Sequence, residues 1–441
     1  MKREIVKYFQ SFISSTEEGK PVLLVEGARQ TGKTTAVQMA IQALPHLYID
    51  LEKEKVFRSQ IDACREFKDW EALLADTYQF KPGQGKILVI DEAQESSHLG
   101  SFVRYMKEDW KNQTTILLGS LMSRLFRDGV REPVGRVERF TVYPFSFKEF
   151  LIAHEKQSLV EAIETWEPNN PFSVNRHAML IDYLQQYLET GGLPEVVQKH
   201  HEGKDWRHTL LQLKIQYEED FTRVFGVEKL SLFQRILKRT AECVGSPSKK
   251  TTIVASSEQG YQTLADMLSQ LERWSLIHRV PQESYEPTRS GRIIPKRYLF
   301  DTGICQLLGG GSRPSVELLS HSSDSMVRDP LGGLLENFVL CELYTLRPES
   351  VHGWRHKTNG SEIDFIFKKE GKTIPVEVKS ALRFRRDFLA PLKNYLHLYN
   401  LEKGFLVDLT PGGMYQEGSQ IIFQIPLYCV SEIHRLGIAT S

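Results

Sequence analysis

The stretch of sequence that decides the fold is Gly27-Ala28-Arg29-Gln30-Thr31-Gly32-Lys33-Thr34. It fits the pattern G-x-x-x-x-G-K-[ST] at every fixed position. The mainly apolar residues 21–26 before it are typical of a short buried parallel strand, and residues 35–44 after it indicate a helix. Strand, glycine-rich loop and helix form the context that a phosphate-binding loop requires. We therefore expect this loop, together with Thr35, to bind ATP.

The residue types in the loop explain why it would bind phosphate. Glycines let the backbone curl so that several N–H groups point inward at phosphate. The N-terminus of the following helix adds a partial positive charge. Lys33 would reach the β- and γ-phosphates, and the hydroxyl of Thr34 would hold Mg²⁺. The motif thus predicts ATP and Mg²⁺ as cofactors.

A second motif predicts hydrolysis. The apolar run 86–90 ends in Asp91 and Glu92, and an acid at the carboxyl end of a central parallel strand lies beside the phosphate crevice. Asp91 would hold the Mg²⁺ shell, and Glu92 would polarise the attacking water. The alternative is that Asp91 caps the next helix. A further strand, 114–119, ends at Ser120, which would either sense the γ-phosphate or cap a helix.

The composition is that of an ordinary globular protein. With 441 residues, 41% hydrophobic and 25% charged, the chain should hold about two to four domains. No apolar run is long enough to cross a bilayer, and the N-terminus lacks the apolar core of a signal peptide. The cysteines show no C-x-x-C spacing, so we expect a cytoplasmic protein without a zinc site or disulfide framework. The net charge is zero, so any nucleic-acid binding must come from local basic patches.

A helix, two strands and a basic loop in the third quarter of the chain are consistent with a winged helix. Residues 263–274 have helical spacing, residues 276–280 and 297–300 read as strands, and the loop 288–297 lies between the strands. The loop contains no acid, and its basic residues are Arg289, Arg292, Lys296 and Arg297. Such a wing would lie on a nucleic-acid backbone, most simply that of DNA. The alternative is a solvated hairpin in a protein-interaction wing.

Residues 361–380 predict a β-hairpin with its tip at 370–371. The register that this tip sets places Asp364 opposite Glu377. Because side chains alternate between the faces of a strand, Glu377 and Lys379 share one face, and Asp364 points to the same side.

Two carboxylates this close repel each other unless a positive charge lies between them. A divalent metal ion would resolve the conflict, and Lys379 would stabilise charge on a phosphate or position water. The arrangement resembles the metal-dependent nuclease pattern PD-(D/E)XK, and Glu336 on the predicted helix 329–343 would supply a third acid. The alternative is a solvent-exposed hairpin with cross-strand Glu–Lys pairs. Basic residues that follow, and that would contact a phosphodiester backbone, are Arg383, Arg385 and Arg386.

Motifs that resemble one family lie along most of the chain, at residues 25–35, 89–94, 119–120, 135–136, 143–150, 191–195, 299–303, 335–337 and 377–380. The family comprises predicted AAA+-superfamily ATPases of bacteria and archaea with a C-terminal domain of unknown function. The resemblance implies an ATPase module, a helical and winged-helix middle, and a restriction-endonuclease-like end. It also implies that Arg136 is an arginine finger in a neighbouring subunit's site, which would need at least a dimer. The alternative for Arg136 is a structural salt bridge.

We predict an α/β protein, because strands and helices alternate through about residue 149 and so favour a parallel sheet covered on both faces. The predicted domains are a P-loop, AAA+-type ATPase domain at 1–155, a helical lid or linker region at 156–245, a winged-helix-like domain at 246–310 and a PD-(D/E)XK nuclease-like domain at 311–441.

Two functional hypotheses follow. In the first, ATP binding and hydrolysis switch a DNA-engaging C-terminal half that is a metal-dependent nuclease. In the second, the protein is a signalling or scaffold ATPase whose nuclease-like domain is inactive and binds a protein partner. The zero net charge favours the second hypothesis, since strong DNA binders are usually basic.

Overall fold

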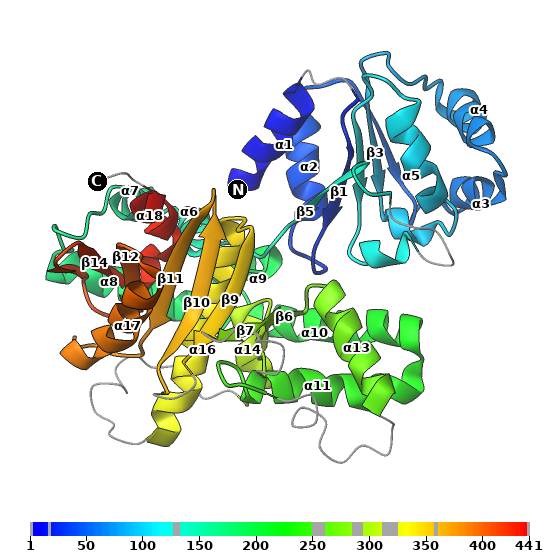
Figure 1. Ribbon diagram of the computed structural model, residues 1–441. Coiled ribbons are helices and arrows are strands. Elements are labelled where there is room, and N and C mark those ends of the chain that lie inside the picture. The colour runs from blue at the N-terminus through cyan, green and yellow to red at the C-terminus, as the bar shows by residue number, and fades with distance from the viewer. Residues whose placement is uncertain are drawn as a thin grey trace. The chain divides into compact units, whose positions relative to one another are not determined.

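The apolar run before the phosphate loop and the run that ends at Asp91 become strands β1 and β3, inside a parallel sheet, in the computed structural model of the chain (Figure 1). The sheet has the strand order β2-β3-β4-β1-β5, and each neighbouring pair is parallel. Its strands are β1 Val22–Glu26, β2 His46–Asp50, β3 Ile87–Asp91, β4 Thr115–Leu118 and β5 Val137–Thr141. The predicted parallel α/β fold of the N-terminal part is therefore confirmed.

Helices cover both faces of this sheet because its central strands are apolar on both faces. Leu23 packs in the core cluster that contains Phe9 of α1, whereas its neighbour Leu24 packs in the cluster that contains Trp70 of α4 and Phe102 of α5. The helical elements of this part are α1 Glu4–Ser14, α2 Lys33–Ile41, α3 Lys55–Ala63, α4 Phe67–Tyr78, η1 Ala93–Glu95, α5 Leu99–Glu108 and η2 Met122–Arg124.

The structure describes residues 3–15, 19–126, 133–248, 261–284, 294–310, 325–356 and 360–438. The chain divides into two compact units, of which the first holds residues 1–143 with 273–275 and the second holds the rest. The four-domain division with boundaries after 155, 245 and 310 stays a prediction. None of the helices in the described ranges is both long and apolar enough to cross a membrane.

The second unit begins with helices, most of which lie within the region 156–245 that we predicted to be a helical lid or linker. A break separates α8 from α9, where Gly191 has a φ of 72° that favours glycine and Pro194 opens α9. The helical elements are α6 Phe147–Ala153, α7 Gln157–Glu164, α8 Val174–Thr190, α9 Pro194–His201, α10 Trp206–Phe225, η3 Val227–Lys229, α11 Leu230–Glu242, α13 Tyr261–Arg273 and α14 Thr302–Leu308.

A small antiparallel strand pair corresponds to the two strands of the predicted wing. Strand β6, Ile277–Val280, pairs with β8, Lys296–Leu299. Arg289 and Arg292, which we predicted to contact nucleic acid, lie outside the described residues.

A seven-stranded mixed sheet contains the predicted hairpin. Its order is β13-β14-β12-β11-β10-β9-β7. The hairpin register is confirmed, because Lys369 pairs with Lys372 and the tip residues Glu370 and Gly371 have φ values of 50° and 70°. Positive φ at both central residues is the requirement of a two-residue type I′ turn. The strands are β7 Gln282–Ser284, β9 Ser350–Arg355, β10 Glu362–Lys369, β11 Lys372–Val378, β12 Lys403–Asp408, β13 Gly413–Glu417 and β14 Gln420–Pro426.

Helices pack against this sheet and bury apolar side chains of its strands. Leu392 and Leu396 of α17 share a core cluster with Trp354 of β9 and Leu406 of β12. The remaining helical elements are α16 Ser325–Thr345, η5 Arg386–Leu389, α17 Ala390–Tyr399, η6 Leu427–Glu432 and α18 Ile433–Ile438. The predicted helix that carries Glu336 is α16.

Candidate functional sites

The phosphate loop needs glycine at its first fixed position. Gly27 has a φ of 138°, and a Cβ there would lie 2.3 Å from the carbonyl oxygen of Val142. Gly32, with a φ of 84°, precedes the first residue of α2. The loop therefore turns sharply from β1 into the N-terminus of α2, which is the geometry of an anion site.

The two functional side chains at the start of α2 lie at this turn. Lys33 is buried, and its Nζ donates to the carbonyl oxygens of Gly27 at 3.1 Å and Ala28 at 2.8 Å. The Thr31 hydroxyl also donates to Ala28 O, at 3.0 Å, and so braces the loop. Lys33 thus lies within the curl of the loop, where a phosphate would replace the carbonyl groups as its partner.

Thr34 and Asp91 come together at the carboxyl edge of the sheet. The Thr34 hydroxyl donates to Asp91 Oδ2 at 2.8 Å, so the two predicted Mg²⁺ ligands are neighbours. A hydroxyl and a carboxylate are oxygen ligands that suit Mg²⁺, and both therefore fit the ion that the motif implies.

Tyr48 is a member of the site that the sequence analysis missed. Its hydroxyl donates to the same oxygen, Asp91 Oδ2. Burial, and then the bond to Asp91, raise the pKa of Tyr48, so it stays a donor at neutral pH. Tyr48 lies on β2, next to β3, and no motif distinguishes it; only strand pairing could have indicated it.

Glu92 follows β3 in a left-handed conformation, with a φ of 49°. Burial raises the pKa of its carboxyl group. The side-chain amide of Gln94 donates to Glu92 Oε2. Gln94 is 2% exposed, and a Cβ at Gly119 would lie 1.8 Å from its Oε1, so Gln94 fills the space between Glu92 and the residue before Ser120. Ser120 itself is half-buried at the carboxyl edge of β4.

Arg136 lies at the amino ends of the strands, opposite the carboxyl ends where Thr34 and Asp91 meet. It immediately precedes β5, and its carbonyl accepts from the backbone N–H of Val22, at the start of β1. Its Nη2 lies 2.8 Å from Glu108 Oε1, which is the salt bridge that we weighed as the alternative. A role as an arginine finger in another subunit stays a prediction.

Arg3 is a second residue near the loop that sequence reasoning missed. Its buried guanidinium donates to the carbonyl oxygens of Thr31 at 2.6 Å and Tyr143 at 2.9 Å. Both acceptors are backbone atoms, so nothing in the sequence marks the contact. Arg3 therefore ties the phosphate loop to the end of the first compact unit.

The predicted acid cluster forms in the second unit, but with a residue that we had placed elsewhere. Lys296 Nζ lies 2.7 Å from Asp364 Oδ1 and 3.1 Å from Glu336 Oε2. Lys379 Nζ lies 2.5 Å from Glu377 Oε1. The backbone N–H of Asp364 donates to Glu377 Oε2 at 3.3 Å, which joins the two pairs.

Burial sets the protonation of this cluster. Burial and the neighbouring Asp364 raise the pKa of both Glu336 and Glu377. Burial also acts to raise the pKa of Asp364, but Lys296 and Lys379 outweigh it and hold that pKa below its usual value. Of the three acids, Asp364 is therefore the one whose ionised form the two lysines favour most strongly.

Two expectations need correction here. Lys296 and Arg297 are 4% and 2% exposed, so the prediction that they contact nucleic acid is wrong. Arg297 instead donates to Ser248 O at 2.9 Å and pairs with Glu272. The acids at 336, 364 and 377 do not fit a divalent ion as they stand, since an ammonium lies among them. Within the described ranges, no group of three His, Cys, Asp or Glu side chains is arranged to hold a metal.

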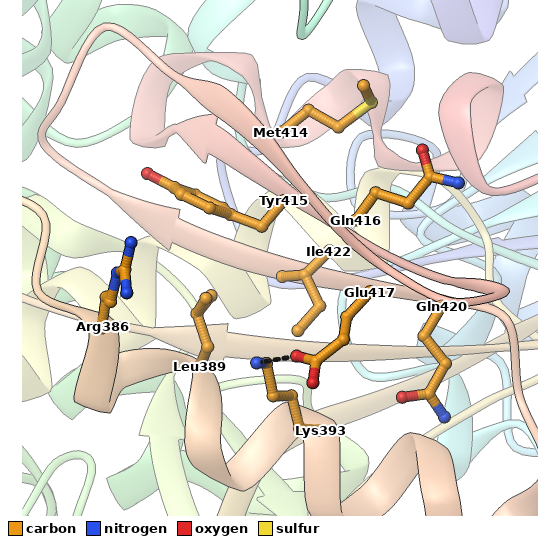
Figure 2. Close-up of a pocket in the computed structure, with 9 residues that line it drawn as sticks. All are labelled: Arg386, Leu389, Lys393, Met414, Tyr415, Gln416, Glu417, Gln420 and Ile422. Atoms are coloured by element: carbon orange, nitrogen blue, oxygen red, sulfur yellow. Dashed lines mark hydrogen bonds and ion pairs between the residues drawn. The ribbon is translucent and has the colours of Figure 1, made fainter.

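The three arginines after the hairpin lie at the surface. Arg383, Arg385 and Arg386 are exposed, and Arg385 pairs with Asp387 at 2.8 Å. Arg386 borders a pocket of about 420 Å³ in which Lys393 and Glu417 form an ion pair (Figure 2). The pocket is lined by Arg386, Leu389, Lys393, Met414, Tyr415, Gln416, Glu417, Gln420 and Ile422.

Other motif residues form hydrogen bonds that hold the second unit together. Asp301 accepts from the backbone N–H of Gly192 at 2.8 Å and caps α14 by accepting from Ile304 N at 2.9 Å. Asn337 is fully buried, and its Oδ1 accepts from the backbone N–H of Leu299 at 2.7 Å. These motif residues therefore have structural roles.

The strand order, the glycine loop and the Thr34–Asp91 pair define the N-terminal unit as an AAA-type P-loop domain. In agreement, a family model described as "AAA domain" matches residues 19–151. Two families described as domains of unknown function, DUF8612 and DUF4143, match residues 181–314 and 331–430.

Two proteins are similar to this chain in sequence, one over most of its length and one over a smaller part. A Haemophilus influenzae protein described as uncharacterised is 23% identical over 417 residues, which is 91% of each chain. An uncharacterised protein of Methanocaldococcus jannaschii is 24% identical over 178 residues, 40% of this chain and 36% of that protein. Among solved structures, a Walker-type ATPase of Pyrococcus abyssi has a TM-score of 0.43 at 13% identity, over 70% of this chain and 95% of that one. The class of the N-terminal unit thus rests on the AAA-domain match and on the loop geometry.

Proposed function

We propose that this protein binds ATP with Mg²⁺, hydrolyses it, and uses the nucleotide state to control its C-terminal half. The observation that carries the proposal is the 2.8 Å hydrogen bond between Thr34 and Asp91, with Glu92 directly after Asp91. A phosphate loop alone would support binding. A carboxylate next to the magnesium ligands supports hydrolysis as well.

Different residues would bind the phosphates, bind Mg²⁺ and activate the water. The N–H groups at the start of α2 and the Lys33 ammonium would hold the phosphates. Thr34 and Asp91 would hold Mg²⁺, which, when bound, neutralises charge on the phosphoryl oxygens. Glu92 would orient the water and accept its proton, and it must be released by Gln94 to do so.

Nucleotide binding and turnover test this proposal with two variants and a control. Lys33→Ala should lose binding of a fluorescent ATP analogue, because the phosphates lose their ammonium partner. Glu92→Gln should bind ATP but hydrolyse it at least about 10²-fold more slowly, because an amide accepts no proton. Lys111→Ala, which removes an exposed lysine, should match wild type in both assays. Unchanged turnover in Glu92→Gln would refute the role of Glu92.

For the C-terminal half, the buried lysine among the acids supports the scaffold alternative, in which a nuclease-like domain does not cleave and binds a partner. The test is incubation of supercoiled DNA with Mg²⁺ or Mn²⁺, comparing wild type with Lys379→Ala. If neither protein nicks the DNA, the result supports the scaffold alternative. If wild type nicks the DNA and Lys379→Ala does not, the domain is a nuclease.

DNA engagement without cleavage is a second candidate, supported by the exposed Arg383 and Arg386. Phosphate contacts make affinity fall steeply with salt. We expect a variant with both arginines changed to alanine to bind DNA more weakly, with a shallower salt slope. Absence of DNA binding by wild type at low salt would eliminate this candidate.

A further inference from the structure

The acid cluster of the second unit already contains a cation. Lys296 Nζ lies 2.7 Å from Asp364 Oδ1 and 3.1 Å from Glu336 Oε2, so one ammonium bridges carboxylates from β10 and α16. Glu377, from β11, joins them through its contact with the backbone N–H of Asp364. The ammonium therefore lies where a divalent ion would otherwise relieve the repulsion between the acids.

The fold holds this ammonium in place. Lys296 is the first residue of β8, where its backbone pairs with Val280 of β6 and forms a bridge with Pro247. Tyr298, two residues along and therefore on the same face of the strand, donates to Glu336 Oε2 at 2.8 Å. Strand β8 thus delivers both a positive charge and a hydroxyl group to the acids.

The charges explain why the acids need a cation, and why either a lysine ammonium or a divalent metal ion could supply it. Asp364 and Glu377 are almost fully buried, and buried carboxylates are costly unless they are paired. Lys379 supplies one positive charge, to Glu377. Lys296 supplies the second, to Asp364 and Glu336. Without the Lys296 ammonium, Asp364 and Glu336 would lose the partner that they share. Carboxylate oxygens are the ligands that a hard divalent cation prefers.

We propose that Lys296 is the resident cation of this cluster, taking the place of a divalent metal ion, and that the three acids bind such an ion only when the ammonium is removed. The proposal is independent of the proposed ATPase function, because it concerns residues of the second unit alone. It assigns Lys296 a role as a built-in substitute for a metal, which keeps the nuclease-like centre in a metal-free form.

Mn²⁺ binding to the full chain tests the proposal. All proteins carry Asp91→Asn, which removes the predicted magnesium ligand of the N-terminal unit, and no nucleotide is added. In calorimetry or by electron paramagnetic resonance, Lys296→Met should gain one bound Mn²⁺ per chain relative to the Lys296 protein. Its melting temperature should rise with Mn²⁺, because an ion that binds only the folded state stabilises it.

Two further proteins separate the outcomes. Lys296→Met with Asp364→Asn has fewer uncompensated charges and lacks a ligand, so it should fold and lose the gained Mn²⁺. The second variant is Glu377→Gln in the protein that retains Lys296. It should bind as much Mn²⁺ as the protein with Glu377, because the acids hold no Mn²⁺ while Lys296 is present. Mn²⁺ binding at the acids while Lys296 is present would overturn the proposal, and so would a folded Lys296→Met that gains none. The first of these outcomes can be measured even if Lys296→Met fails to fold.

Discussion

The Thr34 hydroxyl donates a hydrogen bond of 2.8 Å to Asp91 Oδ2, although the two residues are 57 positions apart. The contact joins the N-terminus of α2 to the carboxyl end of β3, which are adjacent only because the parallel sheet places their edges together.

Removal of the Tyr48 hydroxyl should weaken magnesium binding. Tyr48→Phe deletes one of the two side-chain donors to Asp91 Oδ2, so the carboxylate is oriented less firmly. We expect Mg²⁺ to support nucleotide binding only at about tenfold higher concentration, the usual scale for an outer partner of a metal ligand. The measurement is an Mg²⁺ titration with a fluorescent ATP analogue. Tyr78→Phe, which removes a hydroxyl from Glu54 instead, is the matched control and should leave the titration unchanged.

Loss of Arg3 should loosen the phosphate loop. Arg3→Ala removes charged hydrogen bonds to Thr31 O and Tyr143 O, and each such bond contributes about 1.5–3 kcal/mol. If about 1.4 kcal/mol of this free energy stabilises the ATP-bound form of the loop, its loss lowers ATP affinity about tenfold. Equilibrium binding measures the effect, and Lys7→Ala, an exposed charge on α1, is the control. Equal affinities for the two variants would show that Arg3 does not act on the loop.

The ATPase should lose activity in mild acid. Burial raises the pKa of Glu92 above its ordinary value of 4.5, and only the ionised carboxylate accepts a proton. Activity should therefore be present above the raised pKa and decline as the pH falls through it. The profile of kcat/KM reports the free enzyme, so its acid limb should have a midpoint above 4.5. The residual rate of Glu92→Gln should lack this limb; a limb shared by both proteins would assign it to another group.

Asn337 should matter for stability. Asn337→Ala leaves the backbone N–H of Leu299 buried without its acceptor, which costs about 1–3 kcal/mol. A lower urea midpoint for the second unit would report the loss. Asn394→Ala is the control: within the described residues its Nδ2 is buried without a partner, so its removal should cost less. Equal midpoints for the two variants would contradict the role of Asn337.

Local pattern was enough to predict much of the fold. The phosphate loop, the apolar strands around it and the hairpin register of Lys369 with Lys372 were all predicted correctly. Each depends on neighbouring residues, through glycine geometry, apolar runs or a two-residue turn. The hairpin also predicted that Asp364 and Glu377 would be neighbours.

The sequence by itself therefore determined the class of the N-terminal unit and the acids that cluster in the second. Only the tertiary structure decided what lies among those acids. Lys296 is 40 positions from Glu336 and 68 from Asp364, and in the sequence it reads as one of several basic loop residues. Strand pairing of β8 with β6, and the contact of β8 with α16, turn it inward. Long-range packing of this kind follows from burial of the whole chain, which no short pattern encodes, and it reversed our interpretation of Lys296 from a phosphate contact to a buried cation.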